Sequence, residues 1–124
     1  MKLINDFFNI VDAKTEEGVY RCKVKLNADH ALYKVHFPGN PITPGVCLVQ
    51  MASEILSQQY GKDLLLCKAG SIKFKKPVVP NDEPTFVFSK MINDEGRLKA
   101  QIFVEDEENQ FAKMSLTFCE VVRL

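Results

Sequence analysis

The sequence predicts an α+β fold in which one long helix packs against about six mostly antiparallel strands. Three observations lead to this prediction. Apolar side chains cover most of the helical circumference in residues 44–60, and Gly61 follows as a left-handed helix cap. Residues 19–26 alternate between apolar and charged side chains, as a half-buried strand does. From residue 64 onwards, apolar segments of strand length alternate with short turns.

The part of the chain before the long helix is expected to contain a hairpin. A short helical turn is predicted within residues 1–8, and a strand at 8–14 leads through a turn at 16–18 into the strand at 19–26. One face of this second strand is predicted to be buried: Tyr20, Cys22, Val24 and Leu26. A connector with a short extended piece at 32–35 follows. After the helix, strands are predicted at residues 64–75, 85–92, 97–105 and 111–122.

A stiff loop precedes the long helix. Three prolines in residues 38–44 each fix a backbone angle, and nearby glycines permit conformations that other residues avoid. Because such a loop loses little entropy on ordering, it can hold a side chain in one place, and His36 stands at its start. Thr43 is expected to cap the helix, with Pro44 at the first helical position.

Length and composition are those of one globular domain, which we expect to span residues 1–124. Hydrophobic residues make up 46% of the chain and charged residues 26%, and 16 basic side chains balance 16 acidic ones. Zero net charge argues against general binding of nucleic acid or of a membrane surface, because no basic excess could hold phosphates. No apolar run approaches the roughly 20 residues that span a bilayer, and no signal peptide is evident, so we expect a cytoplasmic protein.

The cysteines give no sign of a metal site. Cys22, Cys47, Cys67 and Cys119 lie far apart, and none has a histidine or a second cysteine at metal-ligand spacing. We therefore expect buried thiols in a reducing compartment, and no metal or other cofactor.

Two stretches of the chain form recognisable motifs. Residues 36–41 read HFPGNP and are followed by PGV at 44–46, and residues 73–80 read KFKKPVVP. These stretches resemble the 3-hydroxyacyl-[acyl-carrier-protein] dehydratases of bacterial fatty acid synthesis, the FabZ/FabA type. The first matches the active-site signature of that family almost letter for letter, and the second resembles its KFRRPVVPGD segment. Because the two stretches occur in the right order with fitting elements around them, the resemblance extends over nearly the whole chain.

The resemblance implies a hot-dog fold, in which the sheet wraps the central helix, and a dimer whose subunits join edge to edge. It implies an active site at the dimer interface, with the motif histidine from one subunit and a helix carboxylate from the other. The acyl chain would arrive on the phosphopantetheine arm of acyl carrier protein. We therefore expect acyl carrier protein as partner and a homodimer, or a higher oligomer, as the assembly.

Dehydration of a 3-hydroxyacyl thioester requires a base, a donor to the enolate-like oxygen and an acid for the departing hydroxyl. His36 is the candidate base, because imidazole titrates near neutral pH. Taken alone it would be a hydrogen-bonded loop histidine, but its motif favours the active-site role; His30 has no such motif and is expected to be an ordinary loop or surface residue. The N–H of Gly45 is the candidate donor, and a glycine there would let the substrate come close. The resemblance also places five residues against the substrate: Phe37, Pro38, Gly39, Pro44 and Val46.

The candidate acid departs from the family pattern. Gln50 stands where the family carries Glu or Asp, and a glutamine cannot donate a carboxylic proton. Glu54, one turn later on the same helix face, stands where many relatives have Gln. Three interpretations stay open: His36 is both base and acid while Gln50 orients the hydroxyl, or Glu54 reaches the site, or the chain binds acyl thioesters without dehydrating them well. Alternatively, Glu54 has a structural role, in which its carboxylate pairs with a lysine or arginine near the interface.

We therefore predict a dehydratase that converts 3-hydroxyacyl groups on acyl carrier protein into trans-2-enoyl thioesters, in fatty acid or related lipid or polyketide-type biosynthesis. One alternative is a catalytically weak acyl-thioester-binding subunit of a hetero-oligomer, which Gln50 favours. The other is a hot-dog thioesterase, against which the HFPG loop speaks. Lys73, Lys75 and Lys76 are candidates for contacts with the carrier protein, and a solvated strand face explains them equally well.

Overall fold

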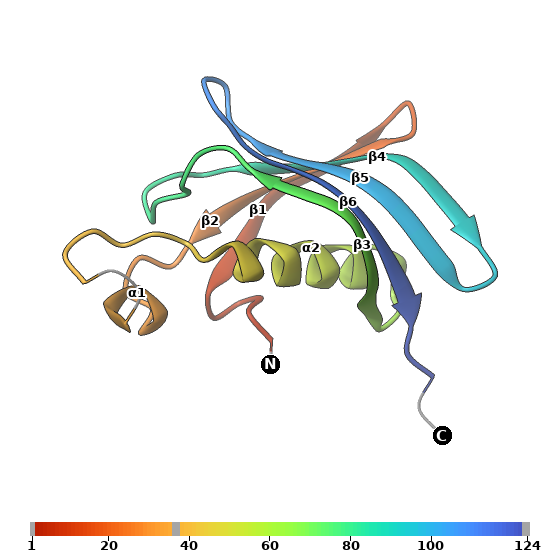
Figure 1. Ribbon diagram of the computed structural model, residues 1–124, viewed down its shortest axis with the longest axis horizontal. Coiled ribbons are helices and arrows are strands. Elements are labelled where there is room, and N and C mark those ends of the chain that lie inside the picture. The colour runs from red at the N-terminus through yellow and green to blue at the C-terminus, as the bar shows by residue number, and fades with distance from the viewer. Residues whose placement is uncertain (1, 36–37, 123–124) are drawn as a thin grey trace.

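The computed structural model describes residues 2–35 and 38–122, which contain six strands and two helices (Figure 1). The strands are β1 (Phe8–Glu16), β2 (Val19–Leu26), β3 (Leu64–Phe74), β4 (Thr85–Asp94), β5 (Arg97–Glu105) and β6 (Gln110–Glu120). The helices are α1 (Leu32–Val35) and α2 (Gly45–Tyr60). The predicted α+β class, with one long helix and about six strands, is confirmed.

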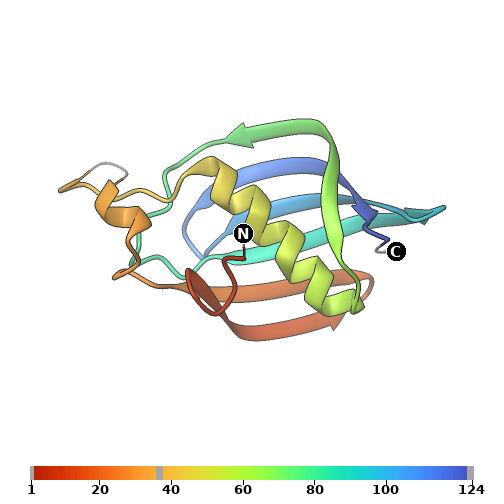
Figure 2. The ribbon, with the colours of Figure 1, turned by 90° about the horizontal axis from the view of Figure 1, so that it is seen from below.

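The six strands form one antiparallel sheet in the order β1-β2-β4-β5-β6-β3. The sheet is curved, and α2 lies across its concave side (Figures 1 and 2). The N-terminal segment that precedes β1 passes along the side of α2 that faces away from the sheet (Figure 2). This order leaves β1 and β3 as the two edge strands.

The hydrophobic core lies between α2 and the concave face of the sheet. In β2 the predicted alternation is confirmed, because Tyr20, Cys22, Val24 and Leu26 are buried and the residues between them are exposed. The buried face of α2 contributes Leu48, Met51, Ala52, Ile55 and Leu56. The largest fully buried side chains from β4 and β6 are Phe86, Phe88, Phe111 and Phe118. Each such ring contributes on the order of 2–3 kcal/mol when removed from water, so the core positions α2 firmly.

The ends of α2 differ in how well the sequence predicts them. Pro44 is the N-cap rather than the first helical residue, and no side chain caps the helix. Thr43 does not cap because its hydroxyl is hydrogen-bonded to Tyr33 instead, at 2.7 Å. Gly61 ends the helix at φ 65°, and its N–H donates to the Ser57 carbonyl, which confirms the predicted left-handed cap. Neither helix in the described part of the chain is long and apolar enough to cross a membrane.

Residues 32–35 form the short helix α1, so the predicted extended piece is wrong. The Leu32 N–H donates to Nδ1 of His30, and the Tyr33 N–H donates to the His30 carbonyl. The Tyr33 ring is buried, with its centroid 5.2 Å from that of Phe7. Capping by His30 and packing of Tyr33 therefore decide the conformation of a segment too short for its own pattern to do so.

β3 runs beside α2 as an edge strand. Ser53 Oγ donates to the Leu64 carbonyl at 2.6 Å, and the Leu64 N–H donates to Ser57 Oγ at 3.0 Å, so the start of β3 is tied to the second half of α2. Four apolar side chains of this strand are exposed, by 55, 40, 39 and 52%: Leu65, Leu66, Ile72 and Phe74. An apolar edge strand of this kind is a surface suited to pairing with another chain.

Two of the four cysteines are joined, which corrects the expectation of thiols throughout. Cys67 in β3 and Cys119 in β6 form a disulfide with a Cα–Cα distance of 5.8 Å. The register brings them together, because Leu65 is paired with Cys119 and a register shift follows next to Cys67. The two cysteines are 52 positions apart in the chain, so the sequence does not show that they are neighbours. Cys22 and Cys47 are buried thiols, as predicted.

Candidate active site

A groove of about 820 Å³ runs along the side of α2 that the sheet leaves open. Its walls come from residues 2–4, from α2 and from the start of β3. The lining residues of α2 recur at helical spacing: Val46, Cys47, Gln50, Ser53, Glu54, Ser57 and Gln58. Val46 is 74% exposed, so one face of α2 is open to solvent although apolar side chains cover most of the helical circumference. The groove therefore contains Gln50 and Glu54, the two helix residues considered for catalysis.

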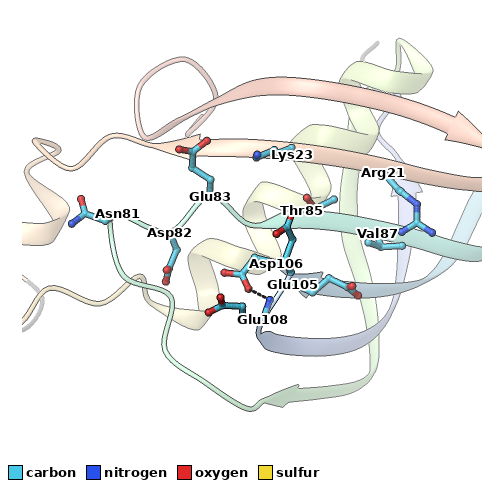
Figure 3. Close-up of a pocket in the computed structure, with 11 residues that line it drawn as sticks. Arg21, Lys23, Asn81, Asp82, Glu83, Thr85, Val87, Glu105, Asp106 and Glu108 are labelled. Atoms are coloured by element: carbon cyan, nitrogen blue, oxygen red, sulfur yellow. Dashed lines mark hydrogen bonds between the residues drawn. The ribbon is translucent and has the colours of Figure 1, made fainter.

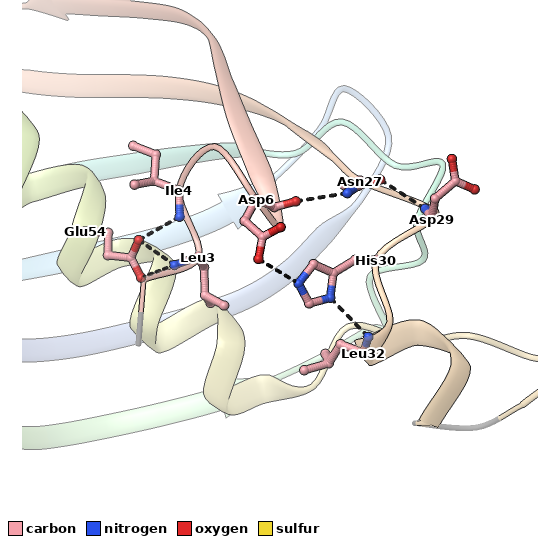
Figure 4. A network of polar contacts seen from close by, with 8 residues as sticks. All are labelled: Leu3, Ile4, Asp6, Asn27, Asp29, His30, Leu32 and Glu54. Carbon is pink, nitrogen blue, oxygen red and sulfur yellow. Dashed lines mark hydrogen bonds and ion pairs between the residues drawn. The ribbon is translucent and has the colours of Figure 1, made fainter.

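The Glu54 carboxylate is buried and accepts backbone hydrogen bonds from the N-terminal segment (Figure 4). The Leu3 N–H lies 2.9 Å from both carboxylate oxygens, and the Ile4 N–H lies 2.7 Å from Oε1. These backbone donors take the place of the lysine or arginine that we expected as a partner. Both carboxylate oxygens therefore already face hydrogen-bond donors. The arrangement makes Glu54 an anchor for the N-terminal segment.

Gln50 lies one turn before Glu54 and is hydrogen-bonded to it. Its Nε2 donates to Glu54 Oε2 at 2.8 Å. The pairing confirms that the two side chains share a face of α2. Gln50 is half-buried, so part of its amide faces the groove.

The first turn of α2 lies against the end of β3. A Cβ atom on Gly45 would lie 2.4 Å from Cζ and 2.5 Å from Cε2 of Phe74. The space that we expected the glycine to open for substrate is therefore occupied by the Phe74 ring. The Gly45 N–H lies in the first helical turn, where an amide has no acceptor four residues earlier within the helix and where the helix dipole favours a developing negative charge.

A hydrogen bond connects the residues on either side of the loop that carries the HFPG motif. The hydroxyls of Tyr33 and Thr43 share a buried hydrogen bond of 2.7 Å, and the Thr43 N–H donates to the Val78 carbonyl at 2.8 Å. Burial raises the pKa of Tyr33 to about 12, so its hydroxyl keeps its proton. These contacts fix where the loop leaves α1 and where it enters α2.

His36 and Phe37 lie outside the described residues, so their predicted roles stay predictions. Pro38 and Gly39 are exposed and do not line the groove. Pro44 and Gly45 form the start of α2, next to Val46 at the near end of the groove. The structure therefore brings Val46, Gln50 and Glu54 together in one groove. Gly45 directly precedes Val46 in the chain and is not among the residues that line the groove.

His30, which the sequence analysis set aside, connects the N-terminal segment to α1 (Figure 4). Because its Nδ1 accepts the Leu32 N–H, Nε2 carries the proton and faces Asp6 Oδ2 at 3.2 Å. The Asn27 amide donates to the Asp6 carbonyl at 2.9 Å. The expectation of an ordinary loop residue is wrong in this respect, because His30 fastens the segment that Glu54 anchors at its other end.

Cys47 lies in the first turn of α2 but is not arranged as a nucleophile. Its side chain is buried, and burial raises the pKa of its thiol. A thiol in this state is the neutral, packed form, in line with the packing role expected from the sequence.

A second hollow, of about 730 Å³, lies on the outer face of the sheet (Figure 3). Arg21 and Lys23 of β2 point to this face because the residues that alternate with them enter the core. Acidic residues dominate the rest of its wall: Asp82, Glu83, Glu105, Asp106, Glu107 and Glu108. In the described part of the chain, no group of His, Cys, Asp and Glu side chains is arranged to hold a metal ion.

Comparison with known proteins identifies the family. The sequence profile of the ApeI-like group, described as ApeI dehydratase, matches residues 12–115. The chain belongs to the ApeI-like family of dehydratases. A 3-hydroxyacyl-[acyl-carrier-protein] dehydratase FabZ from Lactobacillus helveticus is 30% identical to this ApeI-like chain over 110 residues, which cover 82% of the chain and 74% of that protein. The family resemblance stated from the two sequence motifs is thereby confirmed.

Solved structures confirm the hot-dog fold of this ApeI-like chain. A chain of the dehydratase heterocomplex ApeI:P from Xenorhabdus doucetiae matches with a TM-score of 0.69 at 14% identity, covering 89% of this chain and 96% of that one. A variant of a hypothetical thioesterase protein from Streptococcus pneumoniae matches with a TM-score of 0.63 at 16% identity, covering 97% and 94%. At these identities the likeness concerns the fold alone.

Sequence reasoning missed some residues that shape the ApeI-like site. Phe74 could have been found, because it lies within the KFKKPVVP stretch that carries the resemblance. The contribution of Leu3 and Ile4 could not, because they act through backbone N–H groups that every residue except proline has.

Proposed function

We propose that this ApeI-like protein removes water from 3-hydroxyacyl thioesters carried on acyl carrier protein and releases trans-2-enoyl thioesters. The observation that carries the proposal is the groove along α2, which has Gln50 in its wall and begins where the helix N-terminus presents its amides. The family membership supports the reaction class, and the name of the Lactobacillus helveticus relative supports the substrate.

In the proposed reaction, His36 takes the proton from the carbon next to the thioester carbonyl. The Gly45 N–H donates a hydrogen bond to the thioester oxygen as negative charge develops there. The C3–O bond then breaks, the electron pair of the broken C–H bond forms the C2=C3 double bond, and the hydroxyl leaves as water with the proton returned by the imidazolium. No metal or cofactor enters these steps.

Gln50 would orient the departing hydroxyl in this scheme. Of the three interpretations of the missing acid, we propose the one with His36 as both base and acid. Glu54 is held by two backbone N–H groups and by Gln50, so it is poorly placed to give up a proton to substrate. Of the residues expected to contact the acyl thioester, Val46 lines the groove and Pro44 is the N-cap of α2. Phe37, Pro38 and Gly39 stay proposed substrate contacts.

The proposal includes a homodimer that forms through β3. The four exposed apolar side chains of this edge strand, Leu65, Leu66, Ile72 and Phe74, would then be covered by a second copy.

Acyl carrier protein is the proposed partner. Lys75 and Lys76 contact the side chains of Gln110 and Asn109, so both ammonium groups are held at the end of β3. A carrier-bound substrate also implies a location in the cytoplasm, with the enzymes that would load and consume it.

A second candidate function is an acyl-thioester-binding subunit of a hetero-oligomer with little activity of its own. The amide at position 50 favours it, because an amide cannot supply the carboxylic proton. The structural neighbour from Xenorhabdus doucetiae is described as a heterocomplex, which supports asking whether this chain also needs an unlike partner.

The test is to incubate the purified protein with 3-hydroxybutyryl and 3-hydroxydecanoyl acyl carrier protein and to follow the products by mass spectrometry. A dehydratase gives the enoyl thioester, and His36→Ala lowers the rate about 100-fold or more, as expected for loss of a general base. Lys99→Ala, at an exposed position of β5 outside the groove, is the control. Release of free carrier thiol without enoyl product would indicate a thioesterase, and binding without turnover would indicate the subunit.

A further inference from the structure

The edge strand β3 has few buried side chains to anchor it. Its first residue, Leu64, is buried, and two serines of α2 are hydrogen-bonded to the backbone of this residue. Just after its last residue, the Lys75 N–H donates to the Phe111 carbonyl at 2.8 Å. Residues 65–74 between these points are all exposed. Burial of apolar surface therefore contributes little to holding the middle of the strand, and such segments open most readily in a folded protein.

The ladder between β3 and β6 is also interrupted in the middle of β3. Register shifts occur within residues 66–68 and within residues 69–71, and each shift leaves one residue of β3 without a partner opposite it on β6. Cys67 is the residue at the first shift, and its disulfide to Cys119 joins the two strands there. The disulfide therefore cross-links β3 to β6 at a point where burial is small and the ladder is broken.

A thiol in solution can reach this disulfide. Cys67 is exposed, and Cys119 is partly exposed. Cys119 faces the outer side of the sheet, because its neighbour Phe118 enters the core. A dimer that pairs through the edge of β3 would leave this outer side open. The sulfur atoms are therefore accessible to attack by a small thiolate.

The disulfide lies next to the groove along α2 without lining it. Leu65, which is opposite Cys119 in the register, lines the groove, and so do Leu64 and Val121. Neither Cys67 nor Cys119 is part of the groove wall. A change in the middle of β3 would therefore alter the groove wall through Leu65, without removing a cysteine from the site.

The proposed function places the protein in the cytoplasm, where small thiols keep most cysteines reduced. A disulfide that forms in such a compartment is usually transient and either catalytic or redox-sensing. Because Cys67 and Cys119 lie outside the groove, their position fits a sensor rather than a catalyst.

We propose that Cys67 and Cys119 form a redox switch, which fixes β3 and the groove wall when oxidised and lets the middle of β3 open when reduced. This inference rests on the proposed function, which assigns the acyl thioester to that groove. The oxidised protein is the form that binds the acyl thioester more tightly.

A thiol of the glutathione class reduces the switch in two steps. One thiolate attacks the Cys67 sulfur, so that a mixed disulfide forms while the Cys119 sulfur leaves with the electron pair of the broken S–S bond and takes up a proton. A second thiolate attacks the small-thiol sulfur of the mixed disulfide, and Cys67 leaves and takes up a proton. Two small thiols are thereby oxidised to their disulfide and the protein gains two electrons; an excess of the small disulfide reverses both steps.

Hydrogen exchange measures the switch directly. The exchange rates of the backbone amides of residues 65–72 are compared with those of β5, in the oxidised protein and in dithiothreitol. β5 lies inside the sheet and reports the global stability, which reduction also lowers. We expect the ratio of the β3 rate to the β5 rate to rise about tenfold or more on reduction, because the middle of β3 then opens by itself.

Two variants are the controls for this exchange experiment. Cys67→Ser/Cys119→Ser should show the high ratio both with and without dithiothreitol. Cys22→Ala, which removes a buried thiol outside the disulfide, should respond to dithiothreitol as the wild type does.

Ligand binding tests the effect on the groove. Isothermal titration with hexanoyl-pantetheine should give a dissociation constant about threefold or more higher for the reduced than for the oxidised protein. The reason is that the apparent affinity falls with the fraction of molecules whose groove wall is in place. In Cys67→Ser/Cys119→Ser the dissociation constant should match that of the reduced wild type under both conditions.

A ratio of β3 to β5 exchange that does not rise on reduction, or a serine variant that still responds to dithiothreitol, would overturn the proposal. Equal affinities of the oxidised and the reduced protein for hexanoyl-pantetheine would overturn it as well. If the oxidised protein neither binds this thioester nor yields an enoyl product, the proposed function fails, and the exchange ratio alone decides whether the switch exists.

Discussion

The ring of Phe74 lies over the α-carbon of Gly45, so that a methyl group at position 45 would begin 2.4 Å from Cζ of the ring. This contact joins the first turn of α2 to the last residue of β3. It also explains the glycine of the PGV motif by packing within the chain.

Gly45→Ala should therefore destabilise the protein by about 1 kcal/mol, because the added methyl group pushes the Phe74 ring outward. In a Phe74→Ala background the same change should cost nothing or stabilise slightly, since alanine is the better helix former. Urea unfolding of the two single variants and the double variant measures the coupling. Equal effects of Gly45→Ala in both backgrounds would show that the ring does not constrain the glycine.

Loss of the Tyr33–Thr43 contact should loosen the segment that carries His36. Tyr33→Phe leaves the buried Thr43 hydroxyl without its partner, and we expect a loss of about 1–2 kcal/mol in the free energy of unfolding. Tyr33→Phe/Thr43→Val removes both hydroxyls and should be the more stable of the two variants. Faster proteolysis within residues 34–42 of the single variant would confirm the local effect, and equal stability of the two variants would contradict it.

The disulfide between Cys67 and Cys119 should stabilise the sheet edge by restricting the unfolded chain. A cross-link between residues 52 apart is worth about 4 kcal/mol in the loop-closure estimate. We expect a clear drop in melting temperature on reduction, and the same drop in Cys67→Ser/Cys119→Ser. Thiol titration in denaturant without reductant should find only Cys22 and Cys47. Reaction of all the cysteines under those conditions would show that the bond does not form.

Stability should decrease at alkaline pH. Burial raises the pKa of the Cys22 thiol from 9.0 to about 11 and that of the Tyr33 hydroxyl from 10.0 to about 12. Below pH 9 both the folded and the unfolded chain keep the thiol proton, so the full stability is present. Between pH 9 and 11 only the unfolded chain loses it, and Cys22 should then account for a loss of about 2–3 kcal/mol.

Urea unfolding at pH 8, 9, 10 and 11 measures this decline. In Cys22→Ala the decline between pH 9 and 10 should be smaller than in the wild type, because only the buried Cys47 thiol then keeps a proton that the unfolded chain loses, and the tyrosines of the unfolded chain start to ionise near pH 10. Identical pH profiles for the wild type and this variant would show that the buried thiol is not the cause.

The sequence by itself determined the parts of this protein that depend on local patterns. The alternation in β2, the apolar pattern of α2 and the left-handed cap at Gly61 each depend on residues close together in the chain, and the structure agrees with all three. The family could also be predicted from the HFPGNP and KFKKPVVP stretches, because few other kinds of site require these residues in this order.

Tertiary structure alone decided what joins distant residues. The helical form of residues 32–35 follows from the capping by His30 and the burial of Tyr33, and the Cys67–Cys119 bond follows from the register of β3 on β6. The partners of the Glu54 carboxylate are backbone groups 51 and 50 residues away in the chain. Backbone N–H groups and strand register leave no mark in the amino-acid sequence, because every residue but proline has the same donor and a strand can be paired in more than one register.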